Sequence, residues 1–281
     1  MKIYDCFTFY NELDLLELRL HELYDHVDHF VLVEANSTFT NRDKPFNFEL
    51  NRDRYAKYLD KIIYVQVTDM PKSTNAWDNE TFQRNAILRG LVDADANDIA
   101  LVGDVDEILR PETVDQVRAD NKEVMGFRIP YFNFKYNYIL VNNWESYHIW
   151  NVGCRVGMLQ DPNGFRGTRF NLNSFPFDYQ DDNIKIYEHA GWHFTYLGDN
   201  STIKDKISNF SHTELNTDSV LSRIDVDGAI AKGVGFNPDD DRPFTPVALD
   251  DYFPKTIRDN IDQYKDRVIM GITKSARELF S

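Results

Sequence analysis

One stretch of the chain, Ile99-Ala100-Leu101-Val102-Gly103-Asp104-Val105-Asp106-Glu107-Ile108, joins a run of apolar residues to three acidic residues within four positions. The apolar run is typical of a β-strand that is buried on both faces. Ligands of open α/β sheets bind beyond the carboxyl ends of the strands. The acidic cluster therefore follows its strand at the place where such a sheet would bind a ligand.

The sequence before this stretch alternates predicted strands with predicted helices. Strands are predicted over residues 2–9, 29–34 and 61–67, and helices from residue 13 and over about 79–92. In the first helix, apolar side chains recur at spacings of three and four, at Leu13, Leu16, Leu20 and Leu23. The alternation predicts an α/β fold with a mostly parallel central sheet and helices on both faces.

The pattern changes from residue 123 onward. Alternating apolar, aromatic and polar residues predict antiparallel strands, in an aromatic-rich lobe laid against the first sheet, over residues 124–130, 131–141 and 150–159. Residues 160–185 are rich in Asn, Asp, Gly and Pro and are predicted to be loops. A strand over 190–197 and helices near 202–215, 218–232 and 254–267 follow. We interpret residues 1–281 as a single domain with two halves, 1–122 and 123–281.

Composition excludes several classes of partner. The chain has 281 residues, and its 31 Lys and Arg against 46 Asp and Glu give a formal net charge of −15. A field of this sign repels nucleic acids and anionic membrane surfaces. No segment resembles a signal peptide or reaches the roughly 20 apolar residues of a membrane span, so we expect a soluble, cytoplasmic protein. Cys6 and Cys154 lie in apolar surroundings and are expected to be buried thiols rather than a disulfide.

The acidic cluster contains a D-x-D pattern, Asp104 and Asp106, followed by Glu107. Carboxylates this close repel one another, and a divalent cation would offset the repulsion. Mg²⁺ and Mn²⁺ suit carboxylate oxygens and complete their coordination with phosphates and water. The alternative is an acidic turn that caps the next segment, where Pro111-Glu112 could begin a helix.

A second cluster surrounds His193, which lies between Trp192 and Phe194 in the apolar segment Ala190 to Leu197. One interpretation is a functional imidazole that projects from a strand. The alternative is a half-buried histidine whose ring is satisfied by a backbone carbonyl.

Several blocks together resemble glycosyltransferase family 17. They are Asp5 to Leu20, Phe30 to Asn36, Gly103 to Ile108, Ala190 to His193 and Phe253-Pro254-Lys255. That family includes the β-1,4-mannosyl-glycoprotein β-1,4-N-acetylglucosaminyltransferases, which add the bisecting GlcNAc to N-glycans. The resemblance implies a GT-A-like fold, a UDP-sugar donor, with UDP-GlcNAc favoured, and a glycan acceptor. It makes residues 1–122 the nucleotide-sugar-binding half and 123–281 the acceptor-side half.

The resemblance also implies roles for individual residues. Asp104 and Asp106 match a D-x-D that binds Mn²⁺ or Mg²⁺ across the donor diphosphate, and His193 matches a histidine placed on that metal or diphosphate. Inversion at the anomeric carbon requires a base. Glu107 and Glu188 are candidates, of which Glu107 could instead shape the metal loop. Three further candidates are Asp178, Asp181 and Asp182.

An anionic donor requires local positive charge in so acidic a protein. Arg84 is the first candidate, and its alternative is a surface pair with Glu80 one turn earlier. Further substrate-binding candidates occupy loop or strand-end positions that should face the crevice, namely Tyr10, Asn11, Glu12 and Glu34. Trp192 is also a substrate-binding candidate. Glu12 could instead cap its helix. Aromatic residues form either a sugar platform or core, at Tyr131, Phe132, Phe134, Tyr136, Tyr138, Trp144 and Trp150.

These observations together predict a metal-dependent, inverting glycosyltransferase. One alternative is a sugar-phosphate nucleotidyltransferase, a class that normally carries a glycine-rich basic loop near its N-terminus. Residues 1–30 contain no glycine. The other alternative is a carbohydrate-binding protein without catalysis, which would tolerate loss of the metal-binding acids.

Overall fold

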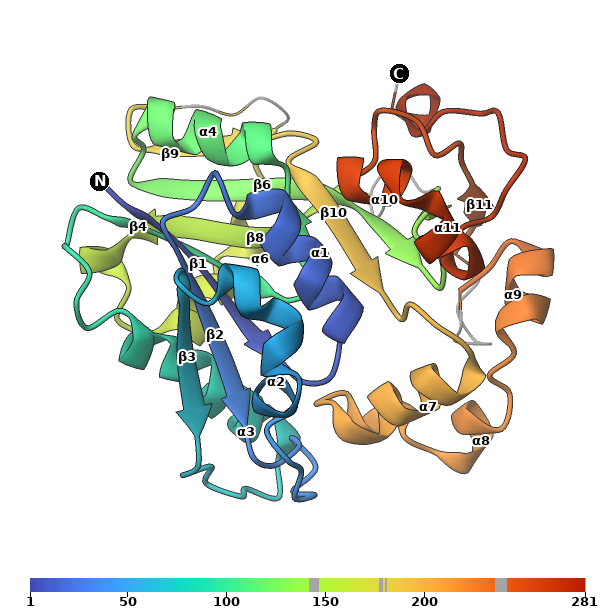
Figure 1. Ribbon diagram of the computed structural model, residues 1–281, viewed down its shortest axis with the longest axis horizontal. Helices are drawn as coiled ribbons and strands as arrows, with labels where there is room; N and C mark the ends of the chain where they lie inside the picture. The colour runs from blue at the N-terminus through green and yellow to red at the C-terminus, as the bar shows by residue number, and fades with distance from the viewer. Residues whose placement is uncertain (142–146, 177–178, 180, 236–241, 281) are drawn as a thin grey trace.

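The structure is a computed structural model and describes residues 1–141, 147–176, 179, 181–235 and 242–280. The first half of the chain alternates strands and helices (Figure 1). Its strands are β1 (Ile3–Phe9), β2 (His29–Ala35), β3 (Ile62–Val67) and β4 (Ile99–Asp104). Its helices are α1 (Leu13–Leu23), α2 (Asn47–Leu50), α3 (Ala76–Asn85) and α4 (Pro111–Asp120), with 3₁₀ segments η1 (Arg52–Tyr58) and η2 (Ala86–Gly90).

The remaining strands are short or antiparallel. They are β5 (Glu107–Leu109), β6 (Val124–Asn133), β7 (Tyr138–Leu140), β8 (Tyr147–Arg155), β9 (Ile184–Tyr187), β10 (Gly191–Thr195) and β11 (Phe244–Pro246). The later helices are α5 (Pro162–Gly167), α6 (Arg169–Leu172), α7 (Asn200–Asn209), α8 (Asp218–Leu221), α9 (Val226–Lys232), α10 (Lys255–Asp259) and α11 (Ile261–Tyr264). Four 3₁₀ segments complete the described chain, η3 (Val156–Met158), η4 (Thr213–Leu215), η5 (Lys265–Arg267) and η6 (Ala276–Leu279).

One sheet runs through both halves of the chain. Within the described residues its order is β11-β7-β6-β8-β4-β1-β2-β3, with β9 and β10 paired to β6 and with β5 paired to β10. The pairs β4-β1, β1-β2 and β2-β3 are parallel, whereas β8 is antiparallel to both β4 and β6. The predicted α/β fold is confirmed, with a parallel first half and with β6, β7 and β8 antiparallel after it, although β9 and β10 each pair with β6 in parallel. Helices α7 to α11 gather on the side of the molecule away from β3 (Figure 1).

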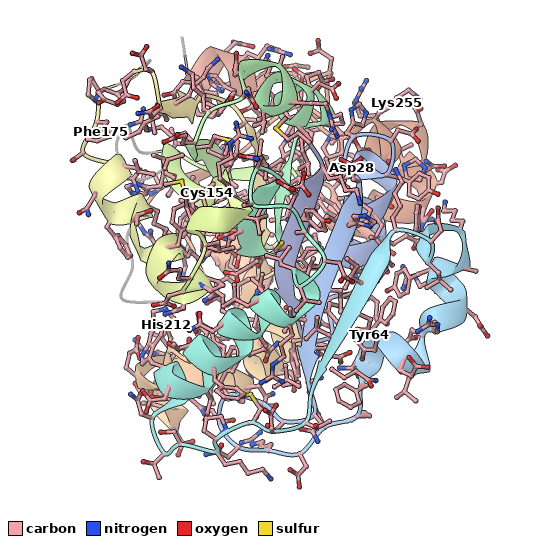
Figure 2. All side chains as sticks on the ribbon, turned by 90° about the vertical axis from the view of Figure 1, so that its left-hand side faces the viewer. Asp28, Tyr64, Cys154, Phe175, His212 and Lys255 are labelled. Carbon is pink, nitrogen blue, oxygen red and sulfur yellow. The ribbon has the colours of Figure 1, made fainter. Side chains whose placement is uncertain are left out.

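Alternation along β1 assigns its side chains to two core layers. Odd-numbered residues such as Phe7 pack toward Leu16 and Leu20 of α1. Even-numbered residues pack on the opposite face, where Cys6 and Cys154 of β8 meet side chains of η2 and α6. Both cysteines are buried free thiols, as predicted, and Figure 2 labels Cys154 among the side chains of this layer. Asp5 has the same odd parity as Phe7 and therefore points toward α1.

The segment 160–185 was predicted to be loops, and this prediction is wrong, because it contains α5, α6 and β9. The side chain of Asp161 caps α5 by accepting a hydrogen bond from the Gly164 amide at 3.0 Å, and Pro162 occupies the first turn. Helix starts use the same residue types as loops, which is why composition alone misled.

The helices predicted near 202–215 and 218–232 are each divided, the first into α7 and η4 and the second into α8 and α9, and two other predicted helices differ in their limits. The helix predicted over 79–92 begins at Ala76, because Asn75 caps it, and gives way to η2 after Asn85. The helix predicted over 254–267 is divided into α10, α11 and η5. Among the helices that the structure describes, none combines the length and the apolar character needed to cross a bilayer.

Candidate functional site

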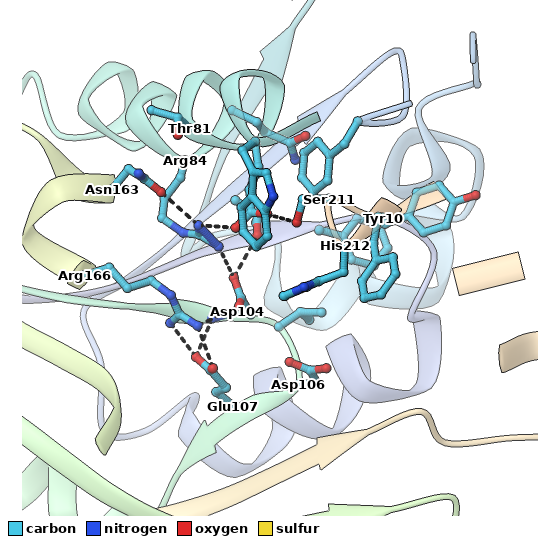
Figure 3. Close-up of a pocket in the computed structure, with 18 of the residues that line it drawn as sticks. Tyr10, Thr81, Arg84, Asp104, Asp106, Glu107, Asn163, Arg166, Ser211 and His212 are labelled. Carbon is cyan, nitrogen blue, oxygen red and sulfur yellow. Dashed lines mark hydrogen bonds and ion pairs between the residues drawn. The ribbon is translucent and has the colours of Figure 1, made fainter. Parts of the chain in front are cut away.

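A cavity of about 480 Å³ opens beyond the carboxyl ends of β1 and β4 (Figure 3). Its walls come from the β1–α1 loop, α3, the D-x-D loop, α5 and α6, β10 and α7. This volume lies within the range of about 300 to 1,000 Å³ typical of small-molecule sites. The predicted position of a ligand at the strand ends therefore coincides with a real cavity.

Asp104 is held between two arginines. Its Oδ1 accepts a hydrogen bond from Arg84 at 2.7 Å and its Oδ2 accepts one from Arg166 at 2.7 Å (Figure 3). Burial alone would raise the pKa of Asp104, but the charges of Arg166 and Arg84 hold that pKa well below its usual range. Arg84 also pairs with Glu80 at 2.7 Å, as the alternative interpretation expected, but it is buried in the cavity wall rather than on the surface, and its predicted contact with a donor stays a prediction.

Glu107 shapes the loop. Its two carboxylate oxygens accept hydrogen bonds from Arg166 at 2.7 Å each, and Oε2 also accepts one from the Asp104 amide at 2.8 Å. Burial works against ionisation, yet the charge of Arg166 lowers the pKa of Glu107. A carboxylate held in this way is fully buried and poorly suited to accept a proton.

Asp106 lies in the cavity wall beside two basic side chains. Its Oδ2 accepts a hydrogen bond from Lys206 of α7 at 2.9 Å, and its Oδ1 is 3.7 Å from Nε2 of His193. Desolvation would lower the pKa of Lys206, but the charge of Asp106 raises it. Burial lowers the pKa of His193, which favours the neutral imidazole that binds metals. The ring of His193 packs edge-on against Tyr131 and Trp150.

The predicted metal ligands fit a divalent ion only in part. Among the described residues there is no ready-made cluster of three or more His, Cys, Asp or Glu that could hold one. Both oxygens of Asp104 face arginines. Asp106 and His193 do fit, since ligands about 2.1 Å from one ion lie at most about 4.2 Å apart. Their 3.7 Å separation meets this limit and is too long for a hydrogen bond between them.

Arg19 of α1 holds the backbone of the D-x-D loop by hydrogen bonds to its carbonyl oxygens. The guanidinium of Arg19 donates to the carbonyl oxygens of Asp104 at 2.9 Å and Glu107 at 2.8 Å, and Asp5 binds its other side at 2.5 and 2.7 Å. Gly103 is needed at the loop's entrance, because an added Cβ would lie 2.2 Å from Nδ2 of Asn151. That amide donates to the Glu107 carbonyl at 3.1 Å.

The first strand-to-helix loop reaches the cavity through Tyr10 and Glu12, whereas Asn11, which was also predicted to face it, lies outside the lining. Oε2 of Glu12 accepts hydrogen bonds from the amides of Tyr10 and Asn11 at 3.2 and 3.1 Å. The side chains of Tyr10 and Asn11 both contact Asp205 of α7, at 3.4 and 3.3 Å. The loop and α7 therefore meet across one side of the cavity.

Glu34 lies outside the cavity lining, contrary to the prediction that it faces the crevice. Its carboxylate is fully buried and accepts hydrogen bonds from Lys44 at 2.7 Å, Tyr64 at 2.8 Å and the Phe48 amide at 3.1 Å. These contacts anchor the segment that begins α2. Burial with a full set of donors explains why the side chain turns inward.

Glu188 and Trp192 also lie outside the cavity lining. Glu188 pairs with the buried Arg128 at 2.6 Å, and the indole of Trp192 donates to the Tyr252 carbonyl at 2.9 Å within the core. Adjacent side chains on β10 point to opposite faces, so His193 reaches the cavity and Trp192 does not. Asp181 and Asp182 are exposed outside the cavity lining. Asp178 lies outside the described residues.

Most of the proposed aromatic platform is core. Four of its rings have no exposed surface, namely Phe132, Phe134, Tyr136 and Tyr138. Trp150 lines the cavity and lies with Tyr131 beside His193. Trp144 lies outside the described residues.

Several cavity residues escaped the sequence reasoning. Arg166 and Arg169 lie in the segment predicted as loops, and Lys206 comes from α7. Trp77 and His212 meet edge-on at 4.6 Å between ring centroids and make another part of the wall aromatic. The Asp161-Pro162 pair, a helix-start signal, is the clue that could have located the two arginines.

Comparison with known proteins supports the resemblance. A human Beta-1,4-mannosyl-glycoprotein 4-beta-N-acetylglucosaminyltransferase is 26% identical over 193 residues, which cover 65% of this chain and 35% of that protein. The rat protein of the same name is 25% identical over 202 residues, covering 68% of this chain and 36% of its own. The chain thus spans about a third of the length of these curated relatives.

Solved structures and a family model complete the comparison. S. aureus TarS 1-349 is 12% identical, covers 78% of this chain and 66% of its own, and has a TM-score of 0.39. A glycosyltransferase involved in the glycosylation of the major capsid of PBCV-1 has a TM-score of 0.32 at 10% identity, covering 67% and 82%. The model of glycosyltransferase family 17 matches residues 1–237. Because this match covers most of the 281 residues of the chain, the chain belongs to glycosyltransferase family 17.

Proposed function

We propose that the protein is a metal-dependent, inverting glycosyltransferase that moves a sugar, GlcNAc by analogy with its relatives, from a UDP-sugar to a glycan acceptor. The observation that carries this proposal is the pair of Asp106 and His193, 3.7 Å apart in the wall of a cavity at the strand ends. Family membership supports glycosyl transfer as the class of reaction.

A nucleoside diphosphate gains negative charge as its bond to the sugar breaks. The proposal therefore requires positive charge beside the diphosphate. A divalent ion held by Asp106 and His193 would neutralise that charge when bound. The chain's own contribution is positional. Lys206 holds the Asp106 carboxylate beside the cavity by a hydrogen bond, and the arginine pairs on Asp104 fix the position of the D-x-D loop.

The proposed base is restricted to carboxylates that line the cavity. Arginine pairing lowers the pKa of Asp104 and of Glu107, which makes both weak bases. Glu188 lies outside the lining. Asp106 is paired with Lys206 and is already assigned to the ion, so among the described lining carboxylates the proposal places the base at Glu12, which has no ion pair.

Thermal shift with a panel of UDP-sugars, with and without Mn²⁺, tests the proposal. A ligand that binds only the folded state raises the melting temperature, so UDP-GlcNAc should do so more strongly when Mn²⁺ is present. Slow release of UDP from the best stabiliser would then show turnover. No metal-dependent shift with any nucleotide sugar would contradict the proposal. Binding without UDP release would favour a carbohydrate-binding protein without catalysis.

A further inference from the structure

The cations that line the cavity are mostly paired with carboxylates. Arg84 binds Asp104 and Glu80, and Arg166 binds Asp104 and Glu107. Two lysines are paired as well, Lys206 with Asp106 and Lys44 with Glu34. Such pairs leave these cations little charge to offer a ligand.

Arg169 is different. It is the first residue of α6 and lines the cavity, yet in the described structure its side chain has no hydrogen bond or ion pair, and its Nη1 is buried without a partner. Its guanidinium lies 5.7 Å from the ring centroid of Trp150 and 5.0 Å from that of Phe170. Burial, together with the charge of nearby Arg166, lowers the pKa of Arg169 to about 10.

An unpaired guanidinium that is partly buried beside other arginines is costly unless an anion joins it. Its planar fork of donors matches phosphate oxygens, and the aromatic rings beside it fix its orientation. The neighbouring carboxylates cannot satisfy it, because Arg84 and Arg166 already occupy Asp104 and Glu107. The arrangement therefore points to an anionic ligand that enters the cavity.

We propose that Arg169 is a phosphate-binding residue, which takes an oxygen of the diphosphate of a nucleotide ligand without needing a metal ion. This inference rests on the proposed function, because the donor defined there supplies the diphosphate. Arg84 and Arg166 act as positioning residues that tie up the nearby carboxylates. The cavity then has two separate means of holding a diphosphate, Arg169 at α6 and the Asp106–His193 pair.

Calorimetric titration of the full chain in EDTA, with inorganic pyrophosphate and with UDP, tests this inference. The wild-type protein should bind both, and Arg169→Gln should bind them at least about tenfold more weakly, as expected for loss of one charge-assisted contact. Arg277→Gln is the matched control, because its side chain is 60% exposed and lies outside the cavity lining, so affinity should not change.

Two results would overturn the inference. One is that the wild-type protein binds neither probe in EDTA, and the other is that Arg169→Gln binds both with wild-type affinity. Arg169→Lys, which keeps the charge but loses the fork, provides a second variant in case the first does not fold, and it should bind more weakly than wild type. Binding that depends on Arg169, without release of UDP from any UDP-sugar in Mn²⁺, would support this inference while contradicting the proposed function.

Discussion

The buried ion pair of Asp5 and Arg19 should contribute strongly both to the free energy of unfolding and to the position of the D-x-D loop. Neither residue has exposed surface, and Arg19 joins the Asp5 carboxylate to the carbonyls of the D-x-D loop. We expect Arg19→Met to lose about 3 to 5 kcal/mol of unfolding free energy, because the Asp5 charge stays buried without a partner. This is a large part of the roughly 5 to 15 kcal/mol that stabilises a typical domain.

The double variant Asp5→Leu/Arg19→Met should be more stable than Arg19→Met alone. Removing both charges leaves mainly the Asp104 and Glu107 carbonyls without this donor, at a cost of about 1 to 3 kcal/mol each. Asn151 still donates to the Glu107 carbonyl, which reduces the cost at that carbonyl. Arg19→Met loses the same two carbonyl contacts, so their cost cancels between the two variants and only the unpaired Asp5 charge distinguishes them. The cycle therefore predicts a coupling energy of at least about 3 kcal/mol between the two positions.

Urea unfolding of wild type, both single variants and the double variant measures this coupling. Titration with UDP and Mn²⁺ on the same four proteins separates stability from positioning. The double variant should recover stability but not ligand affinity, since the loop still lacks the Arg19 donor. Additive unfolding free energies, or wild-type affinity in the double variant, would refute the reasoning.

Three further predictions concern single residues. Asp106→Asn should remove the Mn²⁺-dependent gain in UDP affinity, and full retention of that gain would exclude Asp106 as a metal ligand. Glu188→Gln should keep the rate of UDP release but lower stability to urea, because the buried Arg128 loses the negative charge of Glu188 at 2.6 Å. Hydrogen bonds from the Thr202 amide and then the Ser201 hydroxyl lower the pKa of Asp199 to about 2. Its contribution to stability is thus complete above the unfolded pKa of about 3.9 and is lost as pH falls toward 2. Asp199→Asn should remove this component, measured as the difference in urea midpoint from wild type between pH 5 and pH 3.

The parallel half of the fold was predictable because its signals are local. Strand runs, the leucine spacing of α1 and the acidic residues after β4 each occupy a few consecutive residues. The parity of β1 also follows from the sequence, yet the pairing of Asp5 with Arg19 does not, since it depends on how α1 packs on the sheet. The prediction of loops over 160–185 was wrong because its local signals are ambiguous, since helix caps and loops use the same residue types.

The choice among carboxylates depended on tertiary structure as well. Glu34 lies near the end of β2 and Glu12 follows β1, but α2 and the segment before it surround Glu34 with donors, whereas Glu12 remains in the cavity wall. Glu188 and His193 are only five positions apart in the printed sequence, but β10 carries only His193 into the cavity. Position near a motif is therefore a weaker guide than the partner that each carboxylate finds.

Repulsion within the D-x-D cluster is offset by the protein's own cations. Asp104 and Glu107 are neutralised by Arg84 and Arg166, so close acids alone do not require a metal ion here. The case for a metal therefore rests on geometry rather than on charge repulsion, since Asp106 lies 3.7 Å from His193, an imidazole whose pKa burial lowers. Lys206 occupies the other oxygen of Asp106 at 2.9 Å, so a bound ion would share Asp106 with it. Attraction to Asp106 alone would therefore bind such an ion weakly. A ligand diphosphate whose oxygens complete the coordination of the ion would supply the added affinity.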